Sequence, residues 1–326
     1  MLRNSQLVLP AIYCNYKRKN ILKFLPADLV DYMKEITSLN KNRNLQITNQ
    51  ISELNVLLKQ NGINPIFIKG SCNLIQGLYE DPAERMIGDI DFLVSEKDYD
   101  LSVKILLDNN YKPVSNIDYN IPFRHYPRLF HKNYLAAVEI HKDMILEKYA
   151  SEFNHTAIKN GIIQKNGFSV LSYDDQKALS IFSNQINDKG FEYKTIGLKN
   201  TYDFLLLNSK KPGIEFALRY NKLKKIIMCF LASVNYMVGD LALDIDNNQK
   251  VKWHLKIFKS FLHDPKKRKY YSKIVRIKFI LVYRLKIILK SFIDKNYRTW
   301  LFKRISDKRW QRKKLVQLRL KKPINN

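Results

Sequence analysis

The chain has 326 residues, of which 45% are apolar and 12% aromatic, a composition that excludes a disordered chain and predicts packed cores. The formal net charge of +27 is uneven, because residues 1–250 hold 32 basic and 27 acidic side chains whereas residues 251–326 hold 25 basic and 3 acidic. The three cysteines lie far apart in the sequence, which excludes a disulfide framework or a cysteine-cluster zinc site. No run approaches 18 uncharged apolar residues, so we expect no membrane-spanning helix.

The first part of the chain mixes helical and strand-like patterns. Apolar residues recur at helical spacing between Asp28 and Asn61, and Ser95 is the predicted N-cap of a helix that ends near Asn109. Residues 66–68 form a short β-rich run, and the segments 89–94 and 135–141 alternate as strands do. We therefore expect an α+β fold, in which a small mixed β-sheet with flanking helices occupies residues 1–170 together with an N-terminal helical region.

The rest of the chain is helical by its apolar pattern. The predicted helices cover residues 174–187, 198–208, 213–220, 222–238, 251–263, 271–293 and 298–318. A polar stretch at 244–250 separates a predicted helical domain, residues 171–250, from a basic amphipathic helical extension, residues 251–326.

Two carboxylates lie two positions apart in the strand-like segment Asp89-Ile90-Asp91. In an extended strand both point to one face, with Cα atoms about 6.5–7 Å apart, and Ile90 faces the core. Converging carboxylates can bridge two divalent cations, and Mg²⁺ favours carboxylate oxygens together with substrate phosphate. A third acid is normally required, and Glu139 on the strand-like segment 135–141 is the candidate. The pattern predicts a metal site formed by Asp89, Asp91 and Glu139.

The tripeptide Lys69-Gly70-Ser71 follows the first strand-like run and opens a helix. Free backbone N–H groups at the start of a helix, together with the helix dipole, form a site for anions. Gly70 lets a phosphate approach the backbone, the Ser71 hydroxyl can donate to a phosphate oxygen, and Lys69 adds positive charge. Arg85 either binds phosphate or anchors the loop that carries the acids. These residues predict a phosphate-binding corner opposite the acids.

These segments together resemble a known family. Its pattern is similar to Lys69-Gly70-Ser71, then Leu78-Tyr79 with Asp81-Pro82, then Arg85-x-x-Gly88-Asp89-Ile90-Asp91-x-Leu93-Val94, and later Val138-Glu139-Ile140-His141. The family is the uncharacterised bacterial nucleotidyltransferase family of the polymerase-beta-like superfamily. The resemblance covers roughly residues 20–240, and the segment from Arg85 to Val94 is its most specific part.

The resemblance implies a reaction and a set of site residues. It implies two Mg²⁺ ions and the transfer of a nucleoside monophosphate from an NTP to an unidentified acceptor hydroxyl or phosphate, with release of pyrophosphate. Asp89, Asp91 and Glu139 would be the catalytic, metal-binding acids. The nucleotide would be bound by residues that surround them, namely Lys69, Gly70, Ser71, Arg85 and His141.

Several other polar residues have two explanations. His141 either orients the acids or contacts the nucleotide, or it is a hydrogen-bonded structural histidine. We expect His125 and His131 to be structural or surface residues. Asp203 lies four residues after Lys199 on a predicted helix, which favours an intrahelical ion pair over a contact with the acceptor or nucleotide.

The basic extension has three possible partners. Residues 271–293 place apolar side chains at 274, 277, 281, 285, 288 and 292 among lysines and arginines. The helix can pack on the body of the protein or lie on an anionic membrane surface. It can also follow a phosphate backbone, with Tyr297, Trp300, Phe302 and Trp310 available for stacking on bases, but the broad apolar stripe favours nucleic acid least. We expect a cytoplasmic protein, peripheral at the inner face of the membrane in the lipid alternative.

Two alternatives to a nucleotidyltransferase remain at the level of the sequence. One is a non-catalytic nucleotide-binding or regulatory module, against which three intact acids argue. The other is a nucleic-acid- or membrane-binding protein that acts through its basic C-terminal helices.

Overall fold

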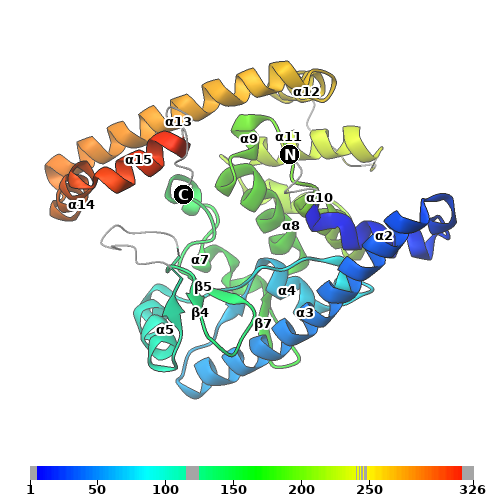
Figure 1. Cartoon of the computed structure of the whole chain (residues 1–326), viewed down its shortest axis with the longest axis horizontal. Coiled ribbons are helices and arrows are strands. Elements are labelled where there is room, and N and C mark those ends of the chain that lie inside the picture. Colours follow the sequence, from blue (N-terminus) through cyan, green and yellow to red (C-terminus); the bar gives the residue numbers. More distant parts are fainter. Residues whose placement is uncertain are drawn as a thin grey trace. The chain divides into compact units, whose positions relative to one another are not determined.

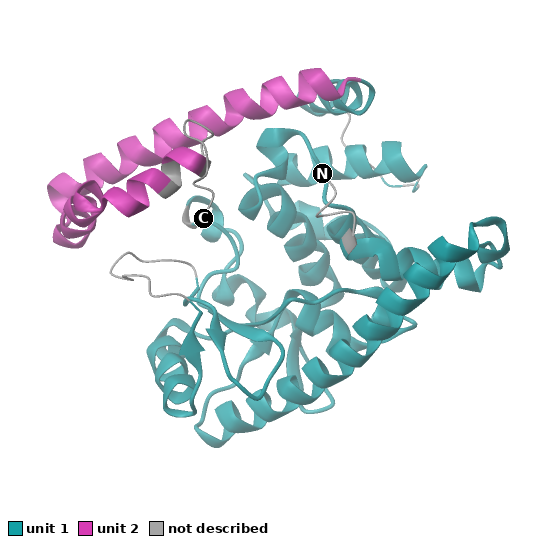
Figure 2. Cartoon of the chain, in the orientation of Figure 1, with its two compact units in different colours: residues 1–115, 124–263 teal, residues 116–123, 264–326 magenta. Residues whose placement is uncertain are grey.

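The computed structural model describes residues 6–114, 125–239, 241, 243, 245 and 248–317. They divide into two compact units, coloured separately in Figure 2: one comprises residues 1–115 and 124–263, the other residues 116–123 and 264–326. None of the helices in the described ranges is both long and apolar enough to cross a membrane. The further division of the first unit at residue 170 stays a prediction.

The sheet of the first unit has seven strands in the order β3-β4-β5-β2-β1-β7-β6. Its strands are β1 (Ile66–Phe67), β2 (Asp89–Leu93), β3 (Lys112–Pro113), β4 (Leu129–Phe130), β5 (Ala137–His141), β6 (Ile162–Lys165) and β7 (Phe168–Leu171). The pairs β2–β5 and β1–β7 are parallel, and the other neighbouring pairs are antiparallel. This mixed sheet confirms the predicted α+β class.

Side chains along the neighbouring strands β2 and β5 alternate between the hydrophobic core and the opposite face of the sheet. Ile90 and Phe92 of β2 and Val138 and Ile140 of β5 are fully buried in the main hydrophobic core. Because side chains alternate along a strand, the intervening residues lie on the opposite face of the sheet. The register pairs Asp91 with Glu139 directly, so two acids of that face are neighbours across the strands.

Helix α3 (Ala27–Gln60) runs along the sheet (Figure 1) and serves two purposes. Its second half packs apolar side chains into the main core, at Ile47, Ile51, Leu54 and Leu58. Its buried asparagines hold the loop before β2: the Asn44 amide donates to the carbonyls of Pro82 and Arg85, and Asn40 donates to the carbonyl of Ala83. Of the apolar positions at helical spacing, Met33, Ile51, Leu54 and Leu58 are buried, whereas Leu29, Tyr32 and Leu39 are exposed. The asparagine contacts depend on the tertiary fold.

The other helices of the first unit surround the sheet or follow it in the chain. The elements before β7 are η1 (Gln6–Val8), α2 (Leu9–Arg18), η2 (Leu22–Phe24), α4 (Lys69–Gln76), η3 (Pro82–Glu84), α5 (Glu96–Asp108), α6 (Glu147–Ala150), α7 (His155–Ile158) and η4 (Lys159–Gly161). After β7 come α8 (Tyr173–Phe182), the π-helical turn η5 (Ser183–Asn187), α9 (Gly190–Tyr193), α10 (Leu198–Lys210), η6 (Glu215–Arg219), α11 (Lys224–Val238) and α12 (Gln249–His263). The expectation of helices from Tyr173 onward is confirmed.

The described part of the second unit consists of α13 (Pro265–Ile293), α14 (Lys295–Ser306) and α15 (Lys308–Gln317). The sequence pattern predicts one helix over 298–318, of which residue 318 lies outside the described ranges. The structure instead ends α14 at Ser306 and begins α15 at Lys308. Asp307 explains the break, because its carboxylate accepts from the backbone N–H of Trp310, 2.9 Å away, as an N-cap does.

Candidate active site

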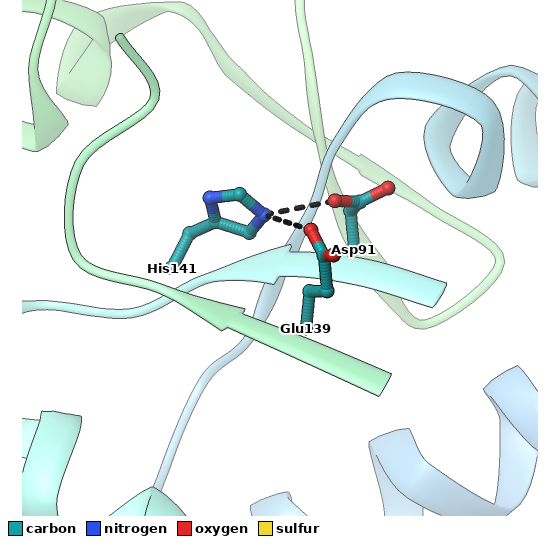
Figure 3. A group of neighbouring side chains, drawn as sticks. All are labelled: Asp91, Glu139 and His141. Atoms are coloured by element: carbon teal, nitrogen blue, oxygen red, sulfur yellow. Dashed lines mark hydrogen bonds and ion pairs between the residues drawn. The ribbon is translucent and has the colours of Figure 1, made fainter. Parts of the chain in front are cut away.

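The three side chains Asp91, Glu139 and His141 converge on one point above β2 and β5 (Figure 3). One potential ligand atom from each lies within 4.8 Å of the others. The parallel pairing of β2 and β5 produces this convergence, because it sets Asp91 opposite Glu139 and Leu93 opposite His141. The structure therefore brings the predicted site residue Asp91 together with Glu139 and His141, the latter 50 residues further along the chain.

His141 is completely buried and its ring is held from both sides. Its Nε2 lies 2.8 Å from Oδ1 of Asp91 and 3.4 Å from Oε2 of Glu139, and its Nδ1 lies 3.3 Å from the backbone carbonyl of Asp143. Without a cation, a proton on Nε2 is donated to the carboxylates. If a metal ion bound there, the proton would lie on Nδ1 and be donated to that carbonyl, which would leave the Nε2 lone pair for the metal. Metal-binding histidines are commonly oriented by this arrangement.

Lys69 supplies positive charge at the centre of the group. Its Nζ lies 2.5 Å from Oδ1 of Asp91, 3.9 Å from Oε2 of Glu139 and 3.3 Å from Nε2 of His141. The residue begins α4 with φ of +54°, a left-handed conformation that is uncommon outside glycine. Lys69 therefore balances part of the charge of two buried carboxylates.

Arg128 is a site residue that the sequence analysis missed. Its Nη2 lies 2.8 Å from Oδ2 of Asp89, and its Nε donates to Oε1 of Glu139, also at 2.8 Å. The guanidinium thus links the third predicted acid, Asp89, to the other two. The short strand β4, next to Arg128, pairs Leu129 with Val138 of β5, and this long-range pairing carries no local sequence signal.

The surroundings set the charge states of the three acids. Burial raises the pKa of Asp89 to about 6, although the Arg128 guanidinium opposes the shift. Burial acts in the same direction on Glu139, but the hydrogen bond from His141 and the charge of Lys69 outweigh it and lower its pKa to about 2. The pKa of Asp91 lies well below its usual range, because Lys69 and His141 outweigh the effect of burial. Asp91 and Glu139 are therefore ionised at neutral pH.

The predicted phosphate-binding corner lies directly beside β2. Ser71 is fully buried, and its hydroxyl oxygen accepts from the backbone N–H of Asp91, 3.2 Å away, so the start of α4 is tied to the strand that carries the acids. A Cβ at position 70 would lie 3.2 Å from Cγ1 of Ile87, so glycine permits close packing there. Binding of phosphate by Gly70 and Ser71 stays a prediction.

Arg85 is buried and engaged within the fold. Its Nε donates to both carboxylate oxygens of Asp203 on α10, at 3.0 and 3.1 Å, and its Nη1 donates to the carbonyl of Met86. Asp203 also accepts from the Tyr79 hydroxyl at 2.8 Å. Asp203, for which the sequence favoured an intrahelical partner in Lys199, thus contacts two residues outside its own helix.

The two other histidines near the sheet differ in their surroundings. The ring of His125 lies 5.0 Å from that of His141, centroid to centroid, and residue 125 forms an isolated antiparallel bridge with residue 141. The Nδ1 of His131 accepts from the backbone N–H of Asn133. His125 therefore borders the site and His131 belongs to a local turn.

The donor set fits a small divalent cation. Two ionised carboxylates and an oriented imidazole nitrogen converge, and Asp89 is joined to them through Arg128. Carboxylate oxygens suit Mg²⁺ and Mn²⁺, and an imidazole ligand is compatible with Mn²⁺ and other transition metals. Lys69 and Arg128 lie against the same oxygens, so a cation bound there would replace part of their charge.

Comparison with known families agrees with this geometry. Residues 2–226 match the family described as uncharacterised nucleotidyltransferase, which covers more than half of the chain. The chain therefore belongs to this nucleotidyltransferase family, as the motifs from Lys69 to Val94 indicated. Searches of curated proteins and of solved structures gave no match.

Proposed function

We propose that the protein is a Mg²⁺-dependent nucleotidyltransferase that transfers a nucleoside monophosphate from an NTP to an acceptor hydroxyl or phosphate and releases pyrophosphate. The observation that carries the proposal is the convergence of ionised carboxylates from β2 and β5 next to the start of α4, in a member of this family. Asp89, Asp91 and Glu139 are the proposed metal-binding and catalytic acids.

The charges around the acids suggest how the site would accommodate its substrate. Divalent cations, two in this proposal, would polarise the α-phosphate and offset the charge of the leaving pyrophosphate. In the structure, Lys69 and Arg128 neutralise the carboxylates to which the divalent cations would bind. Each side chain is long and partly exposed, so it can turn from a carboxylate to a phosphate oxygen. We therefore assign both residues to the triphosphate in the loaded site.

The remaining predicted site residues have different proposed roles. Gly70 and Ser71 would receive the triphosphate at the start of α4. His141 would orient Asp91 and Glu139 from below the site, in keeping with its complete burial. The buried pair with Asp203 supports a role for Arg85 in anchoring the loop before β2, rather than in contacting the nucleotide.

A direct assay tests the proposal. The full-length protein would be incubated with each labelled NTP and Mg²⁺ in a cell extract, and both pyrophosphate release and the labelled product would be measured. Asp91→Asn should reduce pyrophosphate release by about a hundredfold or more, because it removes a metal-binding charge. Asp100→Asn on the exposed side of α5 is the matched control and should retain full activity.

The same assay distinguishes an enzyme from the main alternative, a protein that binds nucleotide without converting it. A non-catalytic nucleotide-binding module would bind NTP with Mg²⁺, and the bound nucleotide would remain intact in every extract. Equal activity of Asp91→Asn and the unchanged protein would place the reaction elsewhere and contradict the proposal.

We also propose a cytoplasmic location, which agrees with three buried cysteines that are all free thiols.

A further inference from the structure

Helix α13 carries an apolar stripe that the second unit leaves exposed. The stripe consists of Ile274, Ile277, Leu281, Leu285, Ile288 and Phe292, spaced three or four residues apart along one face. Leu281, Leu285 and Phe292 expose 63%, 57% and 75% of their surface. Isolated exposed apolar residues are common, but a continuous stripe of this length indicates a binding surface.

The stripe is distinct from the face through which α13 packs on its neighbour. Ile287 and Ser291 of α13 are buried, and Ile287 forms a small cluster with Tyr297, Trp300 and Leu301 of α14. Helices α13 and α14 therefore pack against each other through an apolar contact of their own. The apolar stripe is not needed for that contact.

The charge on α13 is of one sign. The helix holds ten lysine or arginine residues and no aspartate or glutamate. The three acids of residues 251–326 lie at helix starts instead: Asp264, Asp294 and Asp307 accept hydrogen bonds from the backbone N–H groups of Lys267, Asn296 and Trp310. The acids thus stabilise the termini of the three helices. Most of the cationic side chains of α13 are exposed, and Lys290 lies over the ring of Tyr297 on α14.

We propose that α13 binds in the surface of a membrane that contains anionic lipid, with the apolar stripe among the acyl chains and the lysines and arginines at the headgroups. An amphipathic helix of high positive charge binds in this way without crossing the bilayer. At about 1.5 Å per residue a helix of 29 residues is about 43 Å long, so it can lie in the membrane plane over several headgroups. This inference concerns the second unit and goes beyond the proposed function.

Nucleic acid is a poorer fit to the same surface. Three of the four aromatic side chains expected to stack on bases are used within the second unit: Tyr297 is buried, and the rings of Trp300 and Trp310 meet edge to face at 6.2 Å. The Arg304 guanidinium lies over both indoles, at 5.7 and 5.5 Å. Only Phe302, among these four, keeps a largely exposed ring. A phosphate backbone would moreover leave the apolar stripe in water.

A second copy of the chain is also disfavoured as the partner. Pairing two stripes face to face would bring together two helices that each carry ten positive charges and no acid. Like charges across an interface oppose association. Anionic lipid supplies both an apolar interior and the opposite charge.

Sedimentation with vesicles tests the inference on the full-length protein. We expect binding to vesicles of phosphatidylcholine with one third phosphatidylglycerol, and none to phosphatidylcholine alone. Leu281→Gln with Leu285→Gln should lower the partition coefficient at least tenfold while the charge is unchanged. The matched control, Leu39→Gln with Leu45→Gln on α3, alters leucines exposed by 59% and 50% and should bind as the unchanged protein does.

Three results would overturn the inference. Equal binding of both glutamine pairs would mean adsorption through charge alone. Failure to bind anionic vesicles, with tight binding to single- or double-stranded nucleic acid, would identify the phosphate backbone as the partner. Self-association that disappears in Leu281→Gln with Leu285→Gln, without vesicle binding, would identify the stripe as a contact between copies. Circular dichroism would verify that both variants keep their helices.

Discussion

The ammonium group of Lys69 lies between the two most buried carboxylates of the site, 2.5 Å from Asp91 and 3.9 Å from Glu139. It holds this place from the start of α4 with a left-handed backbone conformation. A lysine in that position balances charge that a divalent cation would otherwise balance. The Lys69 ammonium and a divalent cation would therefore compete for the same carboxylate oxygens. This competition affects both the stability of the protein and its affinity for metal.

Lys69→Gln should make the protein less stable without metal and more responsive to it. Removal of the ammonium leaves two largely buried carboxylates with less compensation, which we expect to lower the free energy of unfolding by about 1–3 kcal/mol after allowance for partial exposure of Lys69. Urea unfolding with and without Mg²⁺ would measure both effects, with Lys34→Gln on the exposed side of α3 as the control. A smaller Mg²⁺ effect in Lys69→Gln than in the unchanged protein would contradict the competition.

The orientation of His141 predicts a graded loss of metal affinity. His141→Gln removes the imidazole that lies 2.8 Å from Asp91, and loss of a ligand or of its orienting partner typically costs about 10–100-fold in affinity. Titration calorimetry with Mn²⁺ would give the dissociation constants, with His263→Gln at the end of α12 as the control. We expect Asp91→Asn to weaken binding further than His141→Gln. If His141→Gln kept the affinity of the unchanged protein, His141 would be structural only.

The buried ion pair between Arg85 and Asp203 should stabilise the fold, and the effects of removing its two side chains should not be additive. Arg85→Met leaves the Asp203 carboxylate buried beside Tyr79, and a buried charge without its partner typically destabilises a protein by about 3–5 kcal/mol. The double variant Arg85→Met with Asp203→Leu should recover part of that loss, because both charges are gone. Urea unfolding of the two single variants and the double variant forms the cycle that measures the coupling. Additive losses would show that the two side chains act independently.

The alternation of β2 and β5 was visible in the sequence and placed the acids correctly on one face. Ile90, Phe92, Val138 and Ile140 mark the core side by their period of two, and the acids occupy the other positions. The alternation does not predict that β2 and β5 are neighbours, because pairing between segments about fifty residues apart is set by the whole sheet. The family motifs suggested it, and the register of the structure established it.

Arg128 shows where local patterns stop being informative. Strand β4 has two residues, Leu129 and Phe130, too few to show an alternation. The strands β6 and β7 were missed although Asn166-Gly167, both at positive φ, forms a turn typical of a hairpin. The asparagines of α3 similarly look like ordinary polar positions until the loop before β2 packs on them.

His254 in α12 should make a contribution to the stability of the first unit that decreases on acidification. This buried ring stacks on Phe191 at 5.4 Å. Burial, together with the positive charges of Lys194 and Lys225, lowers its pKa from 6.5 to about 3. Well above pH 6.5 neither state binds a proton at this site, so its contribution is constant. Below that value the unfolded chain binds the proton and the folded chain does not, so the free energy of unfolding falls as the pH falls, until the folded pKa is reached.

The slope attributable to His254 approaches about 1.4 kcal/mol per pH unit. Between pH 7 and 5 Asp89, whose raised pKa is about 6, contributes in the opposite direction, so the His254 contribution is the difference in slope between the unchanged protein and His254→Gln. His254→Gln keeps a polar side chain of similar size and should lose less stability than the unchanged protein when urea unfolding is compared at pH 7 and pH 5. His263→Gln, exposed at the end of the same helix, should leave the pH dependence unchanged. An equally steep dependence in His254→Gln would assign the acid sensitivity to other groups and would mean that the buried imidazole accepts its proton without cost.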